Sequence, residues 1–148
     1  MIRIAAAAVT LAALAGCGHG TASSIRPSST RPPSASVTTG AGTHRLTLGS
    51  YCWTGTSGTE SVTGCGDTGD PAQIPGLARL RAHRGETIVI RLGFIPTKPV
   101  VASIGARRYH LPARATLRLR VSGGGVFEVD ASRGSDEAGY LAHLRIAG

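Results

Sequence analysis

Three cysteines have the clearest capacity for chemistry in this sequence, because a thiol can react covalently, form a disulfide or bind a metal. The first, Cys17, follows an apolar run over residues 4–14 that is preceded by Arg3. This run has 11 residues, whereas a permanent membrane span needs about 20. Its length and the preceding charge are typical of a signal peptide, so residues 1–16 predict export.

The stretch Leu14-Ala15-Gly16-Cys17 resembles the lipobox of bacterial lipoproteins. The resemblance implies that a diacylglyceryl transferase attaches lipid to the Cys17 sulfur and that lipoprotein signal peptidase cuts before this residue. Each buried methylene of an acyl chain adds about 0.8 kcal/mol of membrane affinity, so several chains hold a small domain firmly. The resemblance therefore implies a mature protein that is lipid-anchored in the cell membrane, on its extracytoplasmic face.

The other two cysteines, Cys52 and Cys65, have 12 residues between them. Disulfides persist outside the cytoplasm, so export favours a structural disulfide between the two. A redox or zinc-binding pair is the alternative. The spacing is not Cys-x-x-Cys, however, and the chain has no second cysteine pair for zinc.

Composition divides the chain into three parts. Residues 18–43 contain 11 Ser or Thr and few apolar side chains, and such a segment cannot bury enough surface to offset its conformational entropy. We therefore predict a signal peptide over 1–16, the lipidated cysteine and a disordered Ser/Thr/Pro-rich linker over 17–43, and a single domain over 44–148.

The predicted domain consists of strands. Its 21 glycines and 8 prolines, counted over the whole chain, disfavour a helical bundle. Apolar and polar residues alternate, as in half-buried strands, over residues 45–48, 79–83, 88–92, 117–121, 127–130 and 142–146. Seven or eight short strands with frequent turns predict an all-β domain, either an antiparallel sandwich, which we prefer, or a small barrel. The sandwich is immunoglobulin-like in shape only, because the Cys…Trp…Cys spacing of that family is absent.

The start of the domain carries a second resemblance. Gly49-Ser50-Tyr51-Cys52-Trp53, followed by Cys65-Gly66-Asp67, is similar to a motif of small uncharacterised envelope lipoproteins. An Arg-rich, Lys-poor composition makes the chain similar to actinobacterial proteins of this kind. The resemblance implies a β-rich exported domain and no known activity.

Arginines are the first candidates for ligand binding. The chain has a formal net charge of +8, and its alternation places Arg79, Arg81, Arg118 and Arg120 on exposed strand faces. If these strands are neighbours, the four residues form one arginine-rich face that suits phosphate and carboxylate groups. Outside the cell such groups belong to anionic envelope polymers or lipid headgroups, and nucleic acid does not fit an exported protein. The alternative is an ordinary solvated face.

Trp53 and the acidic residues offer weaker candidates. Trp53 is either a stacking platform for a ligand or, as we prefer, a core residue packed on the disulfide. The acidic pairs in residues 67–70 and 136–137 do not match the twelve-residue calcium loop, and acidic residues in Gly-rich segments usually form turns.

Catalytic and redox signatures are missing from the sequence. No serine-hydrolase, zinc-protease or β-lactamase motif occurs, and the histidines are dispersed. A blue-copper site fails because the single methionine is Met1 and the later cysteines are paired. We therefore predict no enzyme activity, no cofactor and no metal. The hypothesis is a binding or structural module at the cell envelope. The alternative is an accessory protein that docks on another exported or membrane protein, and an enzyme is the third and least favoured class.

Overall fold

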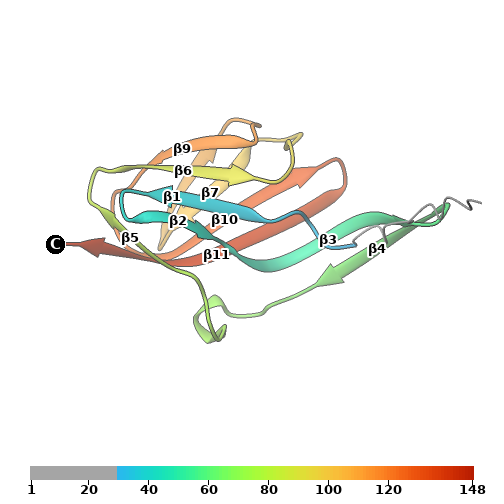
Figure 1. Cartoon of the computed structure of the whole chain (residues 1–148), viewed down its shortest axis with the longest axis horizontal. Helices are drawn as coiled ribbons and strands as arrows, with labels where there is room; N and C mark the ends of the chain where they lie inside the picture. The colour runs from blue at the N-terminus through green and yellow to red at the C-terminus, as the bar shows by residue number, and fades with distance from the viewer. Residues whose placement is uncertain (1–29) are drawn as a thin grey trace, which may run out of the picture.

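A computed structural model describes residues 30–148, so the signal peptide, Cys17 and residues 17–29 of the predicted linker lie outside the described residues. Two β-sheets pack face to face, and a single turn of 3-10 helix, η1 (Pro71–Gln73), lies in a connection between strands. Figure 1 shows the two layers and a long hairpin that projects from one end. This arrangement confirms the predicted β-sandwich.

Four strands form the smaller sheet, in the order β2-β1-β6-β9, with every neighbouring pair antiparallel. Their bounds are β1 (Ala35–Thr39), β2 (Gly42–Arg45), β6 (Thr87–Leu92) and β9 (Thr116–Arg120). β1 and β6 are the central strands, so they hold the sheet together.

Seven strands form the larger sheet, in which β4, β3, β11, β10, β7 and β8 follow one another and β5 also pairs with β11. Their bounds are β3 (Thr47–Ser57), β4 (Glu60–Gly66), β5 (Arg79–His83), β7 (Val100–Ile104), β8 (Arg107–Leu111), β10 (Gly125–Arg133) and β11 (Asp136–Ala147). The first half of β11 pairs with β3 and the second half with β5. The β5–β11 pair is parallel, unlike all other strand pairs within residues 30–148.

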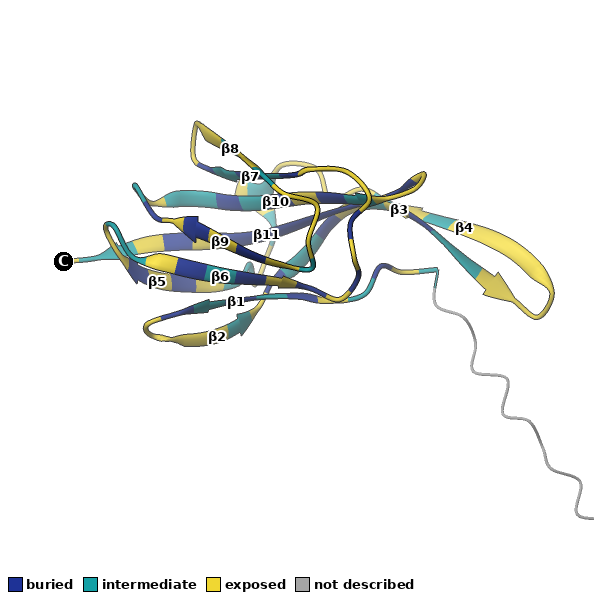
Figure 2. Cartoon of the chain, turned by 90° about the horizontal axis from the view of Figure 1, so that it is seen from above, coloured by how far each residue is buried: buried dark blue, intermediate teal, exposed yellow. Residues whose placement is uncertain are grey.

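The core lies between the two sheets, where alternate side chains of both are buried. Ile88 and Ile90 of β6 belong to the same hydrophobic cluster as Phe127 and Val129 of β10, and all four are 0% exposed. Figure 2 shows this alternation as dark blue segments along the strands. The side chains between them point outward, as the period of a strand requires, and these outward positions carry the candidate functional residues.

The folded domain begins earlier than the predicted boundary at residue 44. β1 lies within the predicted linker, and its Ala35 and Val37 are 1% and 0% exposed. The chain before β1 is also attached, because the Tyr140 hydroxyl donates a 2.6 Å hydrogen bond to the Pro33 carbonyl. The linker prediction was wrong here because it relied on the high Ser/Thr content of the segment and not on the alternation of its apolar residues. Threonine and valine favour strands, and two alternate apolar side chains are enough to give β1 a buried face.

The number of strands also exceeds the prediction, because residues 30–148 form eleven strands and not seven or eight. The additional strands are mostly halves of hairpins that have little apolar alternation. β4, for example, reads Glu-Ser-Val-Thr-Gly-Cys-Gly and has no buried residue. Such strands are held by backbone pairing with a neighbour, which a pattern of buried side chains does not reveal.

Removing β1 provides a test of the corrected boundary. A fragment of residues 30–148 contains both sheets, whereas a fragment of residues 44–148 lacks a central strand and exposes the core beneath it. We expect the longer fragment to unfold cooperatively and the shorter one to lose near-ultraviolet circular dichroism and to bind a hydrophobic dye. Equal unfolding midpoints for the two fragments would contradict the boundary at residue 30.

Candidate functional site

Two of the four predicted arginines belong to a row of basic side chains on the outer face of the larger sheet. The parallel pairing of β5 with β11 places Arg79 beside His143 and Arg81 beside Arg145. All four side chains are exposed and alternate with buried Leu80 and Leu144. We call these four residues, Arg79, Arg81, His143 and Arg145, the basic ladder.

Within residues 30–148 the basic ladder forms no ion pair with an acidic residue. The Arg133–Asp136 ion pair does not involve the ladder, and no hydrogen bond among the same residues restrains the ladder arginines. Like charges repel each other, yet Arg81 lies beside Arg145 in this parallel register. Neighbouring strands lie about 4.8 Å apart and alternate residues about 6.7 Å apart, so several guanidinium groups can reach one anionic ligand.

The other two predicted arginines lie elsewhere, which corrects the prediction of a single face. Arg118 and Arg120 are on β9 in the smaller sheet, whereas Arg79 and Arg81 are on β5 in the larger one. Because inward side chains of both sheets meet in the core, the two pairs point away from each other. Alternation predicted correctly that each pair is exposed, but it carries no information about which strands are neighbours.

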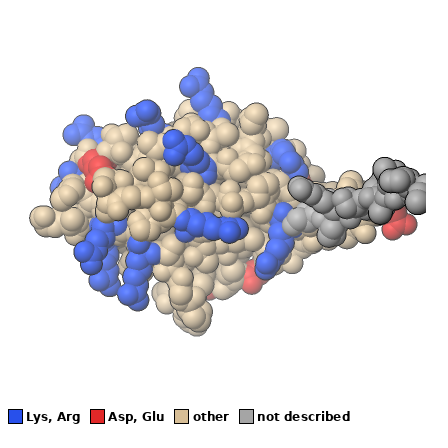
Figure 3. All heavy atoms as spheres, in the orientation of Figure 1, with Lys and Arg blue, Asp and Glu red and all other residues tan. Residues whose placement is uncertain are grey.

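Arg118 and Arg120 share the outer face of the smaller sheet with two arginines that the sequence did not single out, Arg45 and Arg91. Exposed or half-buried threonines stand between them. We call this surface the arginine–threonine face, made of Arg45, Arg91, Arg118, Arg120, Thr38, Thr43, Thr87 and Thr116. None of the four strands contains Asp or Glu. Figure 3 shows basic side chains over this sheet and others at the lower edge, near β5.

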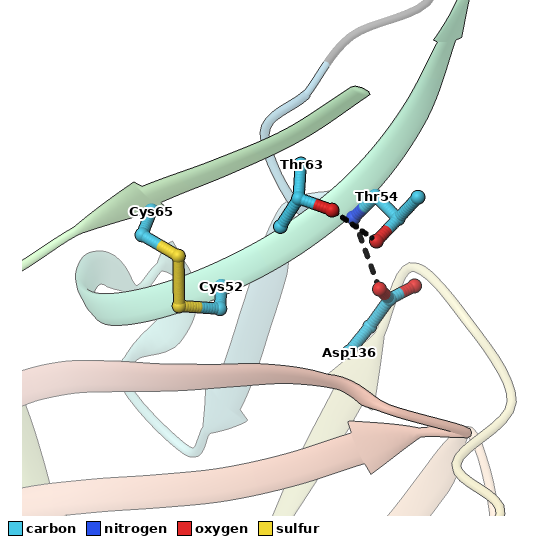
Figure 4. Close-up of a disulfide and its surroundings, with 5 residues drawn as sticks. All are labelled: Cys52, Thr54, Thr63, Cys65 and Asp136. Carbon is cyan, nitrogen blue, oxygen red and sulfur yellow. Dashed lines mark hydrogen bonds between the residues drawn. A yellow bond between two sulfur atoms is a disulfide. The ribbon is translucent and has the colours of Figure 1, made fainter. Parts of the chain in front are cut away.

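The predicted disulfide is confirmed. Cys52 and Cys65 are directly opposite each other in the β3–β4 hairpin, with their Cα atoms 4.1 Å apart. Figure 4 shows the hydroxyls of Thr54 and Thr63 in contact beside the disulfide, 2.9 Å apart. The same figure shows Asp136, which accepts a 2.9 Å hydrogen bond from the Thr54 backbone N–H and so fastens the hairpin to β11.

Trp53 is a core residue and not an open platform for a ligand. It is 3% exposed and packs edge-on against Phe94, with 4.9 Å between ring centroids. The Arg133 guanidinium covers its ring at 4.4 Å. The prediction of packing is therefore confirmed, but not on the disulfide, because successive residues of β3 point to opposite faces and Cys52 is exposed.

A groove of about 680 Å³ lies on the outer face of the larger sheet, at the hairpin end. Its charged lining is Asp67, Asp130, Glu137 and Lys98, and the disulfide, Pro99 and Val101 supply apolar wall. Sequence reasoning missed this groove because its walls come from segments far apart in the chain. The outer face thus changes from acidic at the start of β11, at Glu137, to basic at its end, at Arg145.

Asp130 is the most perturbed acid of the groove. Neighbouring atoms remove part of the water around this carboxyl and Glu128 lies close, and these effects outweigh the attraction of Arg108, so the pKa of Asp130 rises to about 6. The side chain nevertheless keeps substantial exposed area. The ordinary pKa of an aspartate is near 4, so this carboxyl carries a proton over part of the range where other acids are ionised.

Other kinds of site receive no geometric support within the described residues. No three His, Cys, Asp or Glu side chains of residues 30–148 gather as metal ligands would. No helix in the same part of the chain is long and apolar enough to cross a bilayer.

Comparison of the chain with protein-family models, curated proteins and solved structures finds no match. The geometry of the basic ladder, the arginine–threonine face and the groove therefore carries the functional argument.

The Asp130 environment predicts an unusual pH dependence. Because the pKa is raised in the folded state, the carboxyl favours folding when protonated and opposes it as the pH rises through about 6. We expect Asp130→Asn to stabilise the domain at about pH 7 by about 1 kcal/mol or less, since solvent screens an exposed group. The gain should vanish towards pH 4.

Urea unfolding at both pH values measures this effect. Glu60→Gln, at the exposed tip of the β3–β4 hairpin, is the matched control because it removes one negative charge far from the groove. A variant Asp130→Asn that is no more stable than the parent at about pH 7 would contradict the stated environment.

Proposed function

We propose that this protein is a lipid-anchored extracytoplasmic module that binds anionic polymers of the cell envelope through its basic ladder. The observation that carries the proposal is the register that sets Arg81 opposite Arg145, with no ion pair from either arginine to an acid in the described part of the chain. Such an arrangement opposes folding, and sites that break a local rule of stability are commonly functional. A bound anion would relieve the repulsion.

The chemistry of the ladder favours phosphate or carboxylate ligands that repeat along a chain. Arginine presents a planar fork of donors that matches both groups, and it stays charged at any physiological pH. The ladder side chains are exposed and line neither the groove nor the smaller pocket near Tyr140, so they suit a polymer that lies across them better than a small molecule that needs enclosure. The acidic groove at the other end of β11 would repel the same polymer and limits its footprint to the ladder.

The position of the ladder favours a ligand beyond the membrane surface. Thr30, where the described chain begins, lies against Gly64 in the β3–β4 hairpin. The ladder lies on the second half of β11, towards the C-terminus, at the opposite end of the molecule in Figure 1. A lipid attached at Cys17 would hold the hairpin end nearer the bilayer, and the ladder would then lie at the end farther from it.

Charge reversal in the ladder tests the proposed ligand. We expect residues 30–148 to sediment with purified cell wall at low salt and to be released as salt rises, because exposed charge pairs are screened. The variant Arg81→Glu/Arg145→Glu should bind at least about tenfold more weakly, which corresponds to about 1.4 kcal/mol. Vesicles containing an anionic phospholipid, assayed in parallel, distinguish polymer from headgroup binding.

The matched control is Arg107→Glu/Arg114→Glu, which changes the net charge equally at exposed positions outside the ladder. It should bind almost as well as the parent. Equal weakening of binding by both double variants would mean that net charge, and not the ladder, accounts for binding. Stronger binding to vesicles than to cell wall would overturn the proposal that the ligand is an envelope polymer.

Anchoring is tested separately in cells. The variant Cys17→Ala removes the sulfur that would carry the lipid, so we expect it to leave the membrane fraction or to keep its signal peptide. Membrane fractionation and the mass of the mature protein measure both outcomes. The variant Cys52→Ser/Cys65→Ser is the control, because it loses two thiols and should stay membrane-bound. A Cys17→Ala protein that remained at the membrane with normal mature mass would contradict lipidation.

A further inference from the structure

We propose that the domain is bivalent and cross-links anionic polymers, with one chain bound on the basic ladder and a second on the arginine–threonine face. This inference rests on the proposed function and adds a second site and a mechanical role to it. The observation behind it is the division of the exposed arginines between the outer faces of two opposed sheets.

The two faces point in opposite directions because each is the outer side of a sheet whose inner side is buried in the core between the sheets. Arg118 and Arg120 alternate with Leu117 and Leu119, which are 2% and 4% exposed in the core. Arg81 likewise lies between Leu80 and Ala82, at 0% and 2%. Stacked sheets lie about 10 Å apart, so a straight polymer on one outer face cannot also reach the other.

The two faces also share the same chemistry. The basic ladder carries three arginines and the arginine–threonine face carries four. The strands that form the arginine–threonine face contain no acid. Arg91 donates a 3.5 Å hydrogen bond to the Thr38 hydroxyl, and Thr38 and Thr43 contact each other through their hydroxyls at 2.8 Å. These hydroxyls add donors for phosphate oxygens between the guanidinium groups.

A domain with two independent sites can join two polymer chains, which a domain with a single site cannot do. Mixing the domain with a long polymer should therefore produce large particles, whereas a short anion should fill both sites without joining domains to one another. With polymer in large excess, each domain binds one chain and the particles should dissolve.

The experiment uses the full chain in a non-ionic detergent. Calorimetry with inorganic tripolyphosphate counts the sites, and light scattering with long-chain polyphosphate detects linkage. We expect two sites in the parent, and one site in each of Arg81→Glu/Arg145→Glu and Arg91→Glu/Arg118→Glu. Scattering should pass through a maximum as polymer is added to the parent, and should be lost in both variants although each still binds.

Arg107→Glu/Arg114→Glu controls for net charge and should keep two sites and full scattering. One site in the parent that Arg81→Glu/Arg145→Glu abolishes, or scattering that persists in either single-face variant, would overturn bivalency and leave the proposed function intact. One site that only Arg91→Glu/Arg118→Glu abolishes would overturn both. No binding of either phosphate compound by the parent would overturn both. Loss of scattering in the control as well would attribute the particles to net charge, and would also overturn bivalency.

Discussion

The backbone pairing of β11 is the interaction on which the larger sheet and its ladder depend. This 12-residue strand is paired with β10 over most of its length on one side, and with β3 and then β5 on the other. Its inward side chains, Ala138, Tyr140, Ala142 and Leu144, are 0–3% exposed. Because burial fixes its register, its outward residues are fixed as well. The sole parallel pair among residues 30–148 then brings Arg79 beside His143 and Arg81 beside Arg145.

The sequence allowed one half of this arrangement to be predicted. Period-two alternation separates buried from exposed residues whatever the strand order, so the exposure of Arg79, Arg81, Arg118 and Arg120 was foreseeable. Which strand lies beside which depends on contacts between residues far apart in the chain, and alternation contains no such information. The same limit explains the missed groove, whose acids come from β10, β11 and the segment after β4. The domain boundary failed for a local reason, since Ser/Thr content obscured the alternation of Ala35 and Val37.

Cysteine chemistry was more readily predicted because it depends on few alternatives. With one thiol assigned to lipid, two cysteines allow a single pairing, and the hairpin places them opposite each other. The role of the adjacent Trp53 follows from the same strand, since a side chain next to an outward cysteine must point inward. Its partners could not be foreseen. Phe94 comes from the connection after β6, and Arg133 from the end of β10.

The acids of the chain explain why both basic surfaces stay uncompensated. Several carboxylates are engaged in local hydrogen bonds: Glu86 accepts from the backbone N–H groups of His83 and Gly40, which lowers its pKa, and Asp70 accepts from Ala72. Asp136 is held by Arg133 and Thr54. Asp130 and Glu137 lie in the groove, apart from the ladder. In the part of the chain that the structure describes, none of these carboxylates forms an ion pair with an arginine of the basic ladder or of the arginine–threonine face. The positive charge therefore remains available on both outer faces, where self-repulsion is the cost of keeping it.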